Sequence, residues 1–142
     1  MKISPAQIKL LREQAFKVQN HAYAPYSTFH VGAAILTAKG KIYSGCNIEN
    51  ASYGATVCAE RVAVWSALAS GDSAKIAAVY VTVNAAESWP PCGLCRQVLV
   101  EFAAPDAVVF CEGESQKVKK YKLTDLMPEA FVPAALDSAS KK

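Results

Sequence analysis

The stretch Ile76-Ala-Ala-Val-Tyr-Val-Thr-Val-Asn84 decides the fold of this 142-residue chain. Its β-branched and apolar residues run almost without interruption, which is typical of a strand covered on both faces. The prolines of Trp89-Pro90-Pro91 then break the chain, and a helix is expected from about Gly93 to Ala103. A short buried strand over Ala107 to Cys111 follows. A strand, a helix and a second buried strand in this order predict a parallel crossover unit.

The sequence before this unit predicts a helix, a hairpin and a second helix. A capping box begins the first helix, which apolar residues at helical spacing extend over about Ser4 to Tyr23. A strand over Phe29 to Thr37 and an antiparallel partner over Lys41 to Ile48 form the hairpin. The second helix is expected over about Val57 to Ser70, and Gly71 ends it. This helix lies between two predicted strands, so it forms a second parallel crossover unit.

The sequence after the unit predicts a last strand over Val118 to Lys122 and one helical turn over Leu123 to Met127. The whole chain therefore belongs to the α/β class. We expect a three-layer α/β/α domain with a mixed five-stranded sheet. This single domain is expected to span residues 1–132, and residues 133–142 are expected to form a loose C-terminal tail.

Composition excludes several classes of protein. With 52% hydrophobic and 19% charged residues the chain is neither disordered nor fibrous. Its net charge of +3 is too small to suggest a nucleic-acid partner. No stretch has the apolar h-region of a signal peptide or the roughly 18 apolar residues of a membrane span. We therefore expect a cytoplasmic protein with no membrane partner.

The five cysteines are the unusual feature of the composition. Cys58 is expected at the start of the helix after the second strand, and Cys92 and Cys95 at the start of the helix after the third. Ligand sites of α/β sheets lie where strands lead into helices, and helix N-termini stabilise thiolates. Three sulfurs brought to one point favour zinc or an iron–sulfur cluster. Cys46 and Cys111 lie within strands, and we interpret both as core residues.

Three ligands rather than four favour a catalytic zinc, because a structural zinc is closed by four protein ligands. Glu60 follows Cys58 by two residues and is near enough to accept a proton from a zinc-bound water. Arg61 is placed to donate hydrogen bonds to the sulfurs and to offset their negative charge. These residues predict a hydrolytic zinc site.

The cysteine motifs also carry a family resemblance. Cys58-Ala59-Glu60 with Pro91-Cys92-Gly93-Leu94-Cys95 matches the signature of the zinc-dependent nucleoside and nucleobase deaminases. The chain resembles in particular the small homotetrameric cytidine deaminases, and the resemblance runs from about Ala22 to Phe131. The stretches Tyr23–Ala34 and Gly45–Tyr53 extend it. It implies the cytidine deaminase-like form of the α/β/α fold and one zinc ion per subunit.

The resemblance implies hydrolytic deamination of cytidine and deoxycytidine to uridine and deoxyuridine, with release of ammonia, in pyrimidine salvage. In this reaction a zinc-bound hydroxide attacks C4 of the base and Glu60 shuttles the protons. The ribose contacts do not distinguish the 2′ position, so both nucleosides are expected as substrates. The substrate contacts that the resemblance implies are Asn47 and Glu49 for the ribose, Phe29 and the backbone N–H of Ala59 for the base, and Tyr53 and Phe131 across subunit boundaries of a homotetramer.

Three alternatives stay open. A related enzyme could act on another cytosine compound, such as the antibiotic that blasticidin S deaminases take. A polynucleotide editor would need a basic surface with interleaved aromatic residues, which the sequence lacks. A non-enzymatic domain stapled by zinc would need a fourth protein ligand.

Overall fold

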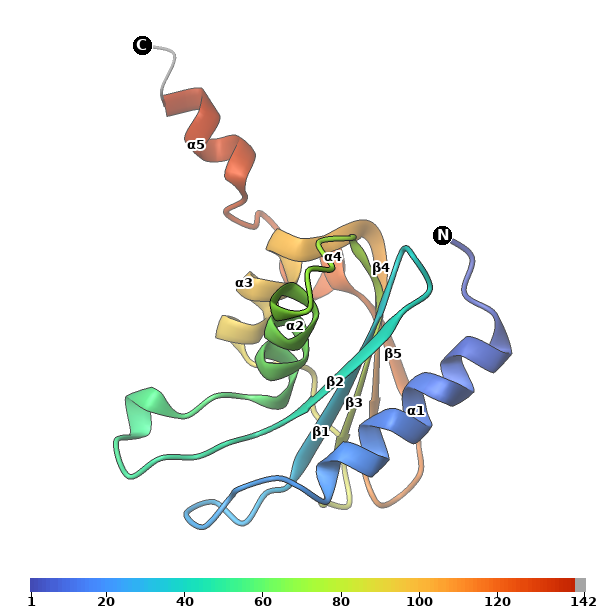
Figure 1. Ribbon diagram of the computed structural model, residues 1–142, viewed down its shortest axis with the longest axis vertical. Helices are drawn as coiled ribbons and strands as arrows, with labels where there is room; N and C mark the ends of the chain where they lie inside the picture. Colours follow the sequence, from blue (N-terminus) through green and yellow to red (C-terminus); the bar gives the residue numbers. More distant parts are fainter. Residues whose placement is uncertain (140–142) are drawn as a thin grey trace.

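A mixed five-stranded sheet forms the centre of the molecule, with helices on both faces (Figure 1). The structure is a computed structural model and describes residues 1–139. The elements, in chain order, are α1 (Pro5–Gln19), β1 (Val31–Thr37), β2 (Ile42–Cys46), the short 3-10 helix η1 (Tyr53–Ala55), α2 (Ala59–Ala69), β3 (Ile76–Val83), α3 (Gly93–Phe102), β4 (Ala103–Glu112), β5 (Lys119–Lys122), α4 (Leu123–Leu126) and α5 (Pro133–Ala139).

The strand order is β2-β1-β3-β4-β5. Strand β1 is antiparallel to both β2 and β3, β3 is parallel to β4, and β4 is antiparallel to β5. Strands β2, β3 and β4 therefore run in one direction, and helices α2 and α3 are the two parallel crossovers that the sequence predicts. Both helices begin beyond the carboxyl ends of these strands, at the same edge of the sheet.

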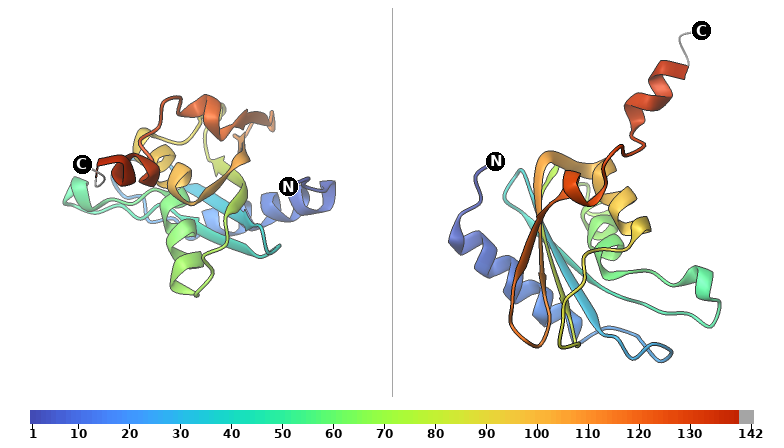
Figure 2. Two further views of the ribbon diagram at one scale, coloured as in Figure 1. Left: turned by 90° about the horizontal axis from the view of Figure 1, so that it is seen from above. Right: turned by 180° about the vertical axis from the view of Figure 1, so that it is seen from behind.

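Two hydrophobic clusters fill the space between the layers. One lies between the sheet and helices α2 and α3, and includes Val64, Val79 and Leu99. The other lies between the opposite face and α1, and includes Leu11 and Tyr80. All eight residues of β3 are buried, as expected for a strand covered on both faces. Figure 2 shows the same separation of α1 from α2 and α3, so the predicted three-layer α/β/α class is confirmed.

Helix α1 begins with the predicted capping box at Ser4 but ends at Gln19, four residues before the predicted Tyr23. Tyr23 instead pairs with the segment after β2. Its N–H donates to the Asn47 carbonyl at 3.0 Å, and its carbonyl accepts from the N–H of Glu49 at 2.8 Å. Tertiary pairing thus overrides the helical spacing of the apolar residues.

Two strand starts also differ from the prediction. Strand β1 begins at Val31 rather than Phe29, because the chain turns at Thr28, whose φ is 62°. Strand β4 begins at Ala103, four residues before Ala107, and its pairing with β3 is irregular between Ile76 and Ala78.

The C-terminal tail expected from residue 133 begins with a helix. Residues Pro133–Ala139 form the short helix α5, which stands away from the sheet and its covering helices (Figure 1). Alanine and leucine at 134–136 favour a helix, and Pro133 suits its first turn. Residues 140–142 of the expected tail lie outside the described residues.

Candidate active site

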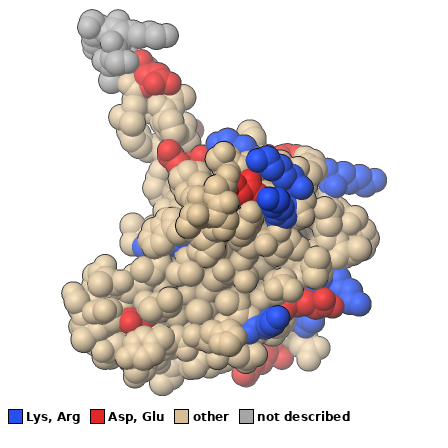
Figure 3. Space-filling view, viewed as in Figure 1, with Lys and Arg blue, Asp and Glu red and all other residues tan. Residues whose placement is uncertain are grey.

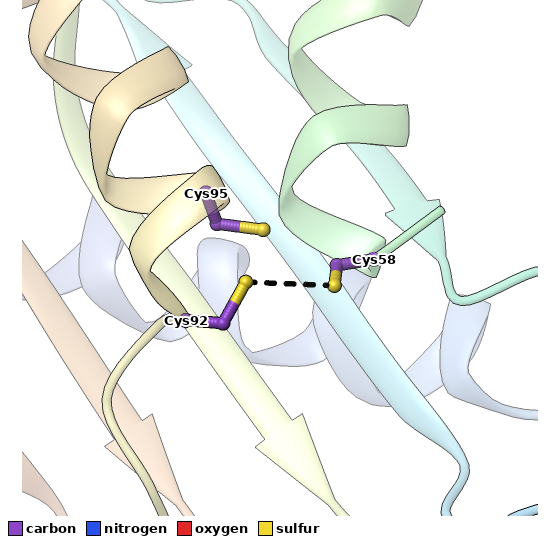
Figure 4. Close-up of side chains that lie close together, drawn as sticks. All are labelled: Cys58, Cys92 and Cys95. Carbon is purple, nitrogen blue, oxygen red and sulfur yellow. Dashed lines mark hydrogen bonds between the residues drawn. The ribbon is translucent and has the colours of Figure 1, made fainter. Parts of the chain in front are cut away.

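The three predicted cysteines meet at the starts of helices α2 and α3. Cys58 is the N-cap of α2, Cys92 is the N-cap of α3, and Cys95 lies in the first turn of α3. Their sulfur atoms all lie within 4.8 Å of one another. Figure 4 shows the three side chains converging from the two neighbouring helices, and the Sγ atoms of Cys58 and Cys92 are 3.8 Å apart.

The close approach of α2 to the sheet places Cys58. Gly45 in β2 faces the first turns of this helix, and a Cβ atom there would lie 2.4 Å from the backbone nitrogen of Ala63. The glycine lets the helix lie directly on the strand. Since α2 and α3 also contact each other, the two helix starts lie side by side, and both direct cysteines toward the same point.

This donor set fits a zinc ion. Tetrahedral zinc with bonds of about 2.3 Å to sulfur separates its sulfur ligands by roughly 3.8 Å, and the Cys58–Cys92 distance has this value. No further Cys, His, Asp or Glu joins the cluster in residues 1–139. Three protein ligands are the set of a catalytic zinc site, whereas a closed structural site has four.

The surroundings of Cys58 favour its thiolate form, which is the form that binds a metal. Contacts with the thiol of Cys95 and the guanidinium of Arg61 lower the pKa of Cys58 to about 5. Nη2 of Arg61 donates to Sγ of Cys58 over 3.4 Å. Arg61 therefore lies beside the sulfurs, within hydrogen-bond distance of Cys58.

Glu60 lies in the first turn of α2 and is only 5% exposed. Burial raises the pKa of its carboxyl to about 7. A carboxyl group with a pKa near neutrality can both accept and release a proton at physiological pH. Glu60 lines the same cavity as Cys58 and Cys92, so a proton acceptor and the metal-binding thiols share one space.

This cavity has a volume of about 370 Å³, which suits a small molecule. Val31, Val81 and Val83 of the sheet form an apolar floor. The start of α2 lines one part of it, and the segment that leads into α3 lines another. Asn47 and Glu49 supply polar groups. The cavity thus combines an apolar surface for a flat ring with a few fixed polar groups.

Asn47 and Glu49 both lie in the cavity lining and also hold the loop before β1. Asn47 Nδ2 donates to the Phe29 carbonyl at 2.7 Å, and its Oδ1 accepts from the Val31 N–H at 2.8 Å. The Glu49 carboxylate accepts hydrogen bonds from the backbone N–H and the hydroxyl of Ser27. These bonds, the one to the hydroxyl first, lower the pKa of Glu49 and keep it ionised as an acceptor.

The structure does not bring three of the predicted substrate contacts into this cavity. Phe29 is 44% exposed and lies outside the lining. Tyr53 is 75% exposed and borders an adjacent hollow, which shares Glu49 with the main cavity. Phe131 is 61% exposed, and its carbonyl accepts from Nε2 of Gln97 at 2.7 Å.

The sequence did not predict a place in the site for the one tryptophan of the lining. Trp89, interpreted from the sequence only as part of a chain break, lines the cavity and contacts the ring of Phe29 edge to face at 5.2 Å. An aromatic residue three positions before the Cys92–Cys95 motif was the available signal. Cys46 and Cys111 are buried at the ends of β2 and β4 and take no part in the cysteine cluster.

The charge on the surface and the length of the helices are relevant to nucleic-acid and membrane partners. On the face shown in Figure 3, most Lys and Arg side chains lie at the upper right and along the right side with Asp and Glu among them, and the left side is mostly uncharged. This distribution does not point to a nucleic-acid surface. Among the described residues, every helix is too short or too polar to cross a lipid bilayer.

Three converging thiols, a buried carboxyl group and a cavity of small-molecule size define a metal-dependent hydrolytic site. The family model "Cytidine and deoxycytidylate deaminase zinc-binding region" matches residues 5–112, which include all of these groups. The chain belongs to this zinc-binding deaminase family.

Individual relatives agree with this assignment. The chain is 39% identical over 123 residues to the cytidine deaminase of Halalkalibacterium halodurans, with 87% of this chain and 92% of that protein covered. It is 40% identical over 122 residues to that of Mycobacterium tuberculosis, covering 86% and 87%. The crystal structure of cytidine deaminase from Burkholderia pseudomallei matches with a TM-score of 0.80 and 44% identity, over 87% of this chain and 98% of that one.

Proposed function

We propose that this chain catalyses the hydrolytic deamination of cytidine and deoxycytidine to uridine and deoxyuridine, with release of ammonia. The observation that carries the proposal is the position of Glu60, which is buried and lines the same cavity as Cys58 and Cys92 of the cysteine cluster. A structural zinc domain would need neither a buried carboxyl group nor a cavity beside the metal. The curated relatives are cytidine deaminases.

The residues of the cavity have distinct roles in this reaction. When bound by the three thiolates, zinc supplies the Lewis acidity that makes water a nucleophile at neutral pH. Glu60 takes a proton from the attacking water, delivers it to N3 of the cytosine ring as C4 is attacked, and then helps to protonate the leaving amine. Its burial and its pKa of about 7 support this double use. The positive charge of Arg61 offsets the negative charge of the three thiolates.

The substrate lies between the cysteines and the polar groups near β2. The backbone N–H of Ala59 binds O2 of the pyrimidine, because it is a free donor at the start of α2. Asn47 and Glu49 bind the ribose hydroxyl groups, for which an amide and a carboxylate are suitable partners. Phe29 reaches the base from the edge of the cavity, where its ring contacts the lining residue Trp89.

We further propose a homotetramer in which Tyr53 and Phe131 complete the sites of neighbouring subunits. Both side chains are largely exposed, and apolar surface of this kind is typical of a subunit interface. Leu136 of the projecting helix α5 is also 61% exposed. Native mass spectrometry of the wild type tests the assembly, and a fully active monomer would contradict the proposal. An activity assay tests the contribution of Phe131, since Phe131→Ala is expected to lower activity.

The proposed setting is pyrimidine salvage in the cytoplasm. All five cysteines are free thiols in the structure. A reducing compartment keeps thiols in the form that binds zinc.

A panel of substrates tests the proposed activity. The zinc-loaded protein is expected to convert cytidine and deoxycytidine to the uracil nucleosides. The change in ultraviolet absorbance and the release of ammonia measure this conversion. Blasticidin S and single-stranded oligonucleotides serve as comparison substrates. Absence of turnover with both nucleosides would contradict the proposal. Turnover of blasticidin S alone would favour the antibiotic deaminases, and turnover of oligonucleotides alone would favour an editor.

A further inference from the structure

We propose that Trp89 determines which pyrimidines the site accepts, by closing the cavity against the C5–C6 edge of the base. This inference rests on the proposed deamination of cytosine nucleosides and concerns the selectivity of the same site. Trp89 lines the cavity together with Cys58 and Glu60. Its side chain is 50% exposed, so part of the indole surface is available to a ligand.

The orientation of the base follows from the chemistry of the cavity. C4 must face the cysteine cluster, since the reaction takes place there. The O2–N3 edge must face the start of α2, where the Ala59 N–H and the Glu60 carboxyl lie. In a pyrimidine ring, C5 and C6 lie on the side opposite O2 and N3. The C5–C6 edge therefore faces the other part of the lining, the segment Ser88–Pro90 that leads into α3.

Hydrogen bonds from the turn after β4 and from Lys119 of β5 hold this segment and the residues just before it. The carbonyl of Ala85 accepts from the N–H of Glu114 at 2.8 Å, and the carbonyl of Ser88 accepts from Nζ of Lys119 at 3.1 Å. Gly113 makes the approach possible, because a Cβ atom there would lie 2.5 Å from the carbonyl oxygen of Ala85. The indole of Trp89 is thus attached to a backbone that is fixed on β4 and β5.

Asn84 links this segment to the loop that carries Phe29. Its Oδ1 accepts from the His30 N–H at 2.7 Å, and its Nδ2 donates to the Thr28 carbonyl at 3.1 Å. The edge-to-face contact of Phe29 with Trp89, at 5.2 Å and 89°, lies between the two linked segments. A substituent on C5 of the base would have to displace both rings and the backbone that holds them.

The test compares cytidine with 5-methylcytidine and 5-bromocytidine as substrates of the zinc-loaded enzyme. Trp89→Ala is expected to raise kcat/KM for the 5-substituted nucleosides relative to cytidine by about tenfold or more. Trp89→Phe is expected to give a smaller increase. Trp65→Ala is the matched control, because Trp65 is 44% exposed on α2 and does not line the cavity. Its selectivity should equal that of the wild type.

The same selectivity in Trp89→Ala as in the wild type, with cytidine still converted, would overturn the inference and leave the proposed activity intact. A wild type that converts no cytidine would overturn both. If Trp89→Ala fails to fold or loses all turnover, the tryptophan fluorescence of another variant tests whether Trp89 contacts the bound base. In Trp65→Phe, Trp89 is the single tryptophan, and the product uridine should change its emission. Unchanged emission at uridine concentrations that inhibit the enzyme would overturn the inference.

Discussion

Nη2 of Arg61 donates a hydrogen bond of 3.4 Å to Sγ of Cys58, three residues earlier at the N-cap of α2. Three thiolates around a divalent ion carry a net charge of −1, and the guanidinium offsets it. Nε of Arg61 is buried without a hydrogen-bond partner among the described residues. The arginine is therefore held beside the sulfurs at a cost in desolvation, as expected for a group that tunes the metal site.

Replacing this arginine should weaken zinc binding. Arg61→Gln removes the charge that compensates the thiolates, and we expect the affinity for zinc to fall by about 10- to 100-fold. Competition with a chromophoric chelator measures the affinity. Arg61→Lys keeps the positive charge but lacks the planar guanidinium with its several N–H donors, so its affinity for zinc should be intermediate. The same zinc affinity in Arg61→Gln as in the wild type would contradict this role.

Glu60→Gln should separate metal binding from turnover. The variant keeps the shape of the side chain and the cysteine cluster, so the zinc content and the melting temperature should remain close to those of the wild type. It cannot carry a proton, and kcat should fall by roughly a thousandfold. Glu13→Gln on the exposed surface of α1 is the matched control and should remain active. Turnover of Glu60→Gln near the wild-type rate would overturn the assigned role.

Cys92→Ala should lose zinc and activity together, because two thiolates remain from a set of three. Cys46→Ala removes a buried thiol outside the cluster and should retain one zinc per chain, with only a modest loss of stability. Elemental analysis of the purified proteins measures the metal content. A fully metallated and active Cys92→Ala would refute the ligand set.

The pair of Arg12 and Glu112 should stabilise helix α1 on the sheet. Glu112 is 1% exposed and accepts two hydrogen bonds of 2.7 Å from Arg12 and one of 2.6 Å from the Tyr80 hydroxyl. Arg12→Leu leaves this carboxylate buried without a cation, which costs several kcal/mol at a fully buried site. Because the Arg12 side chain is 43% exposed, solvent screening reduces the expected loss to about 2 kcal/mol.

This loss should depend on pH. Burial raises the pKa of Glu112, but the hydrogen bonds from Arg12 and Tyr80 outweigh it and hold the pKa below its ordinary value. A carboxyl with a lowered pKa stabilises the fold above its unfolded pKa of about 4.3, and this stabilisation disappears as the pH falls through the folded value. Wild type and Arg12→Leu should therefore differ most at neutral pH and converge in acid.

Urea denaturation across this pH range measures the effect. Both proteins carry the same thiolates, so loss of zinc in acid affects them alike and cancels in the difference. Lys9→Leu is the control, because its ion pair with Glu13 is exposed and 3.9 Å long; its cost should remain within about 0.5 kcal/mol at every pH. A difference between wild type and Arg12→Leu that does not change with pH would contradict the account.

The sequence predicted the parts of the fold that depend on local pattern. The unbroken apolar run of β3 predicted a strand buried on both faces, and the positions of Cys58 and Cys92 at helix starts predicted their convergence. The predictions were wrong where distant segments compete. The end of α1 depends on the pairing of Tyr23 with residues after β2. The helical spacing of the apolar residues in α1 carries no information about this distant pairing.

The site was predictable only in part for the same reason. The cysteines and Glu60 lie in short motifs whose spacing reflects their chemistry. Trp89 carries no such motif, and its place in the cavity depends on contacts with Phe29 and with the backbone held by Lys119. The partners of Glu112, likewise, are 32 and 100 residues away along the chain.

X-ray absorption spectroscopy at the zinc edge tests the central claim, that Cys58, Cys92 and Cys95 hold a catalytic zinc. The purified protein with one zinc per chain should show three sulfur ligands at about 2.3 Å and one oxygen or nitrogen ligand at about 2.0 Å. Four sulfur ligands would identify a closed structural site and contradict the account.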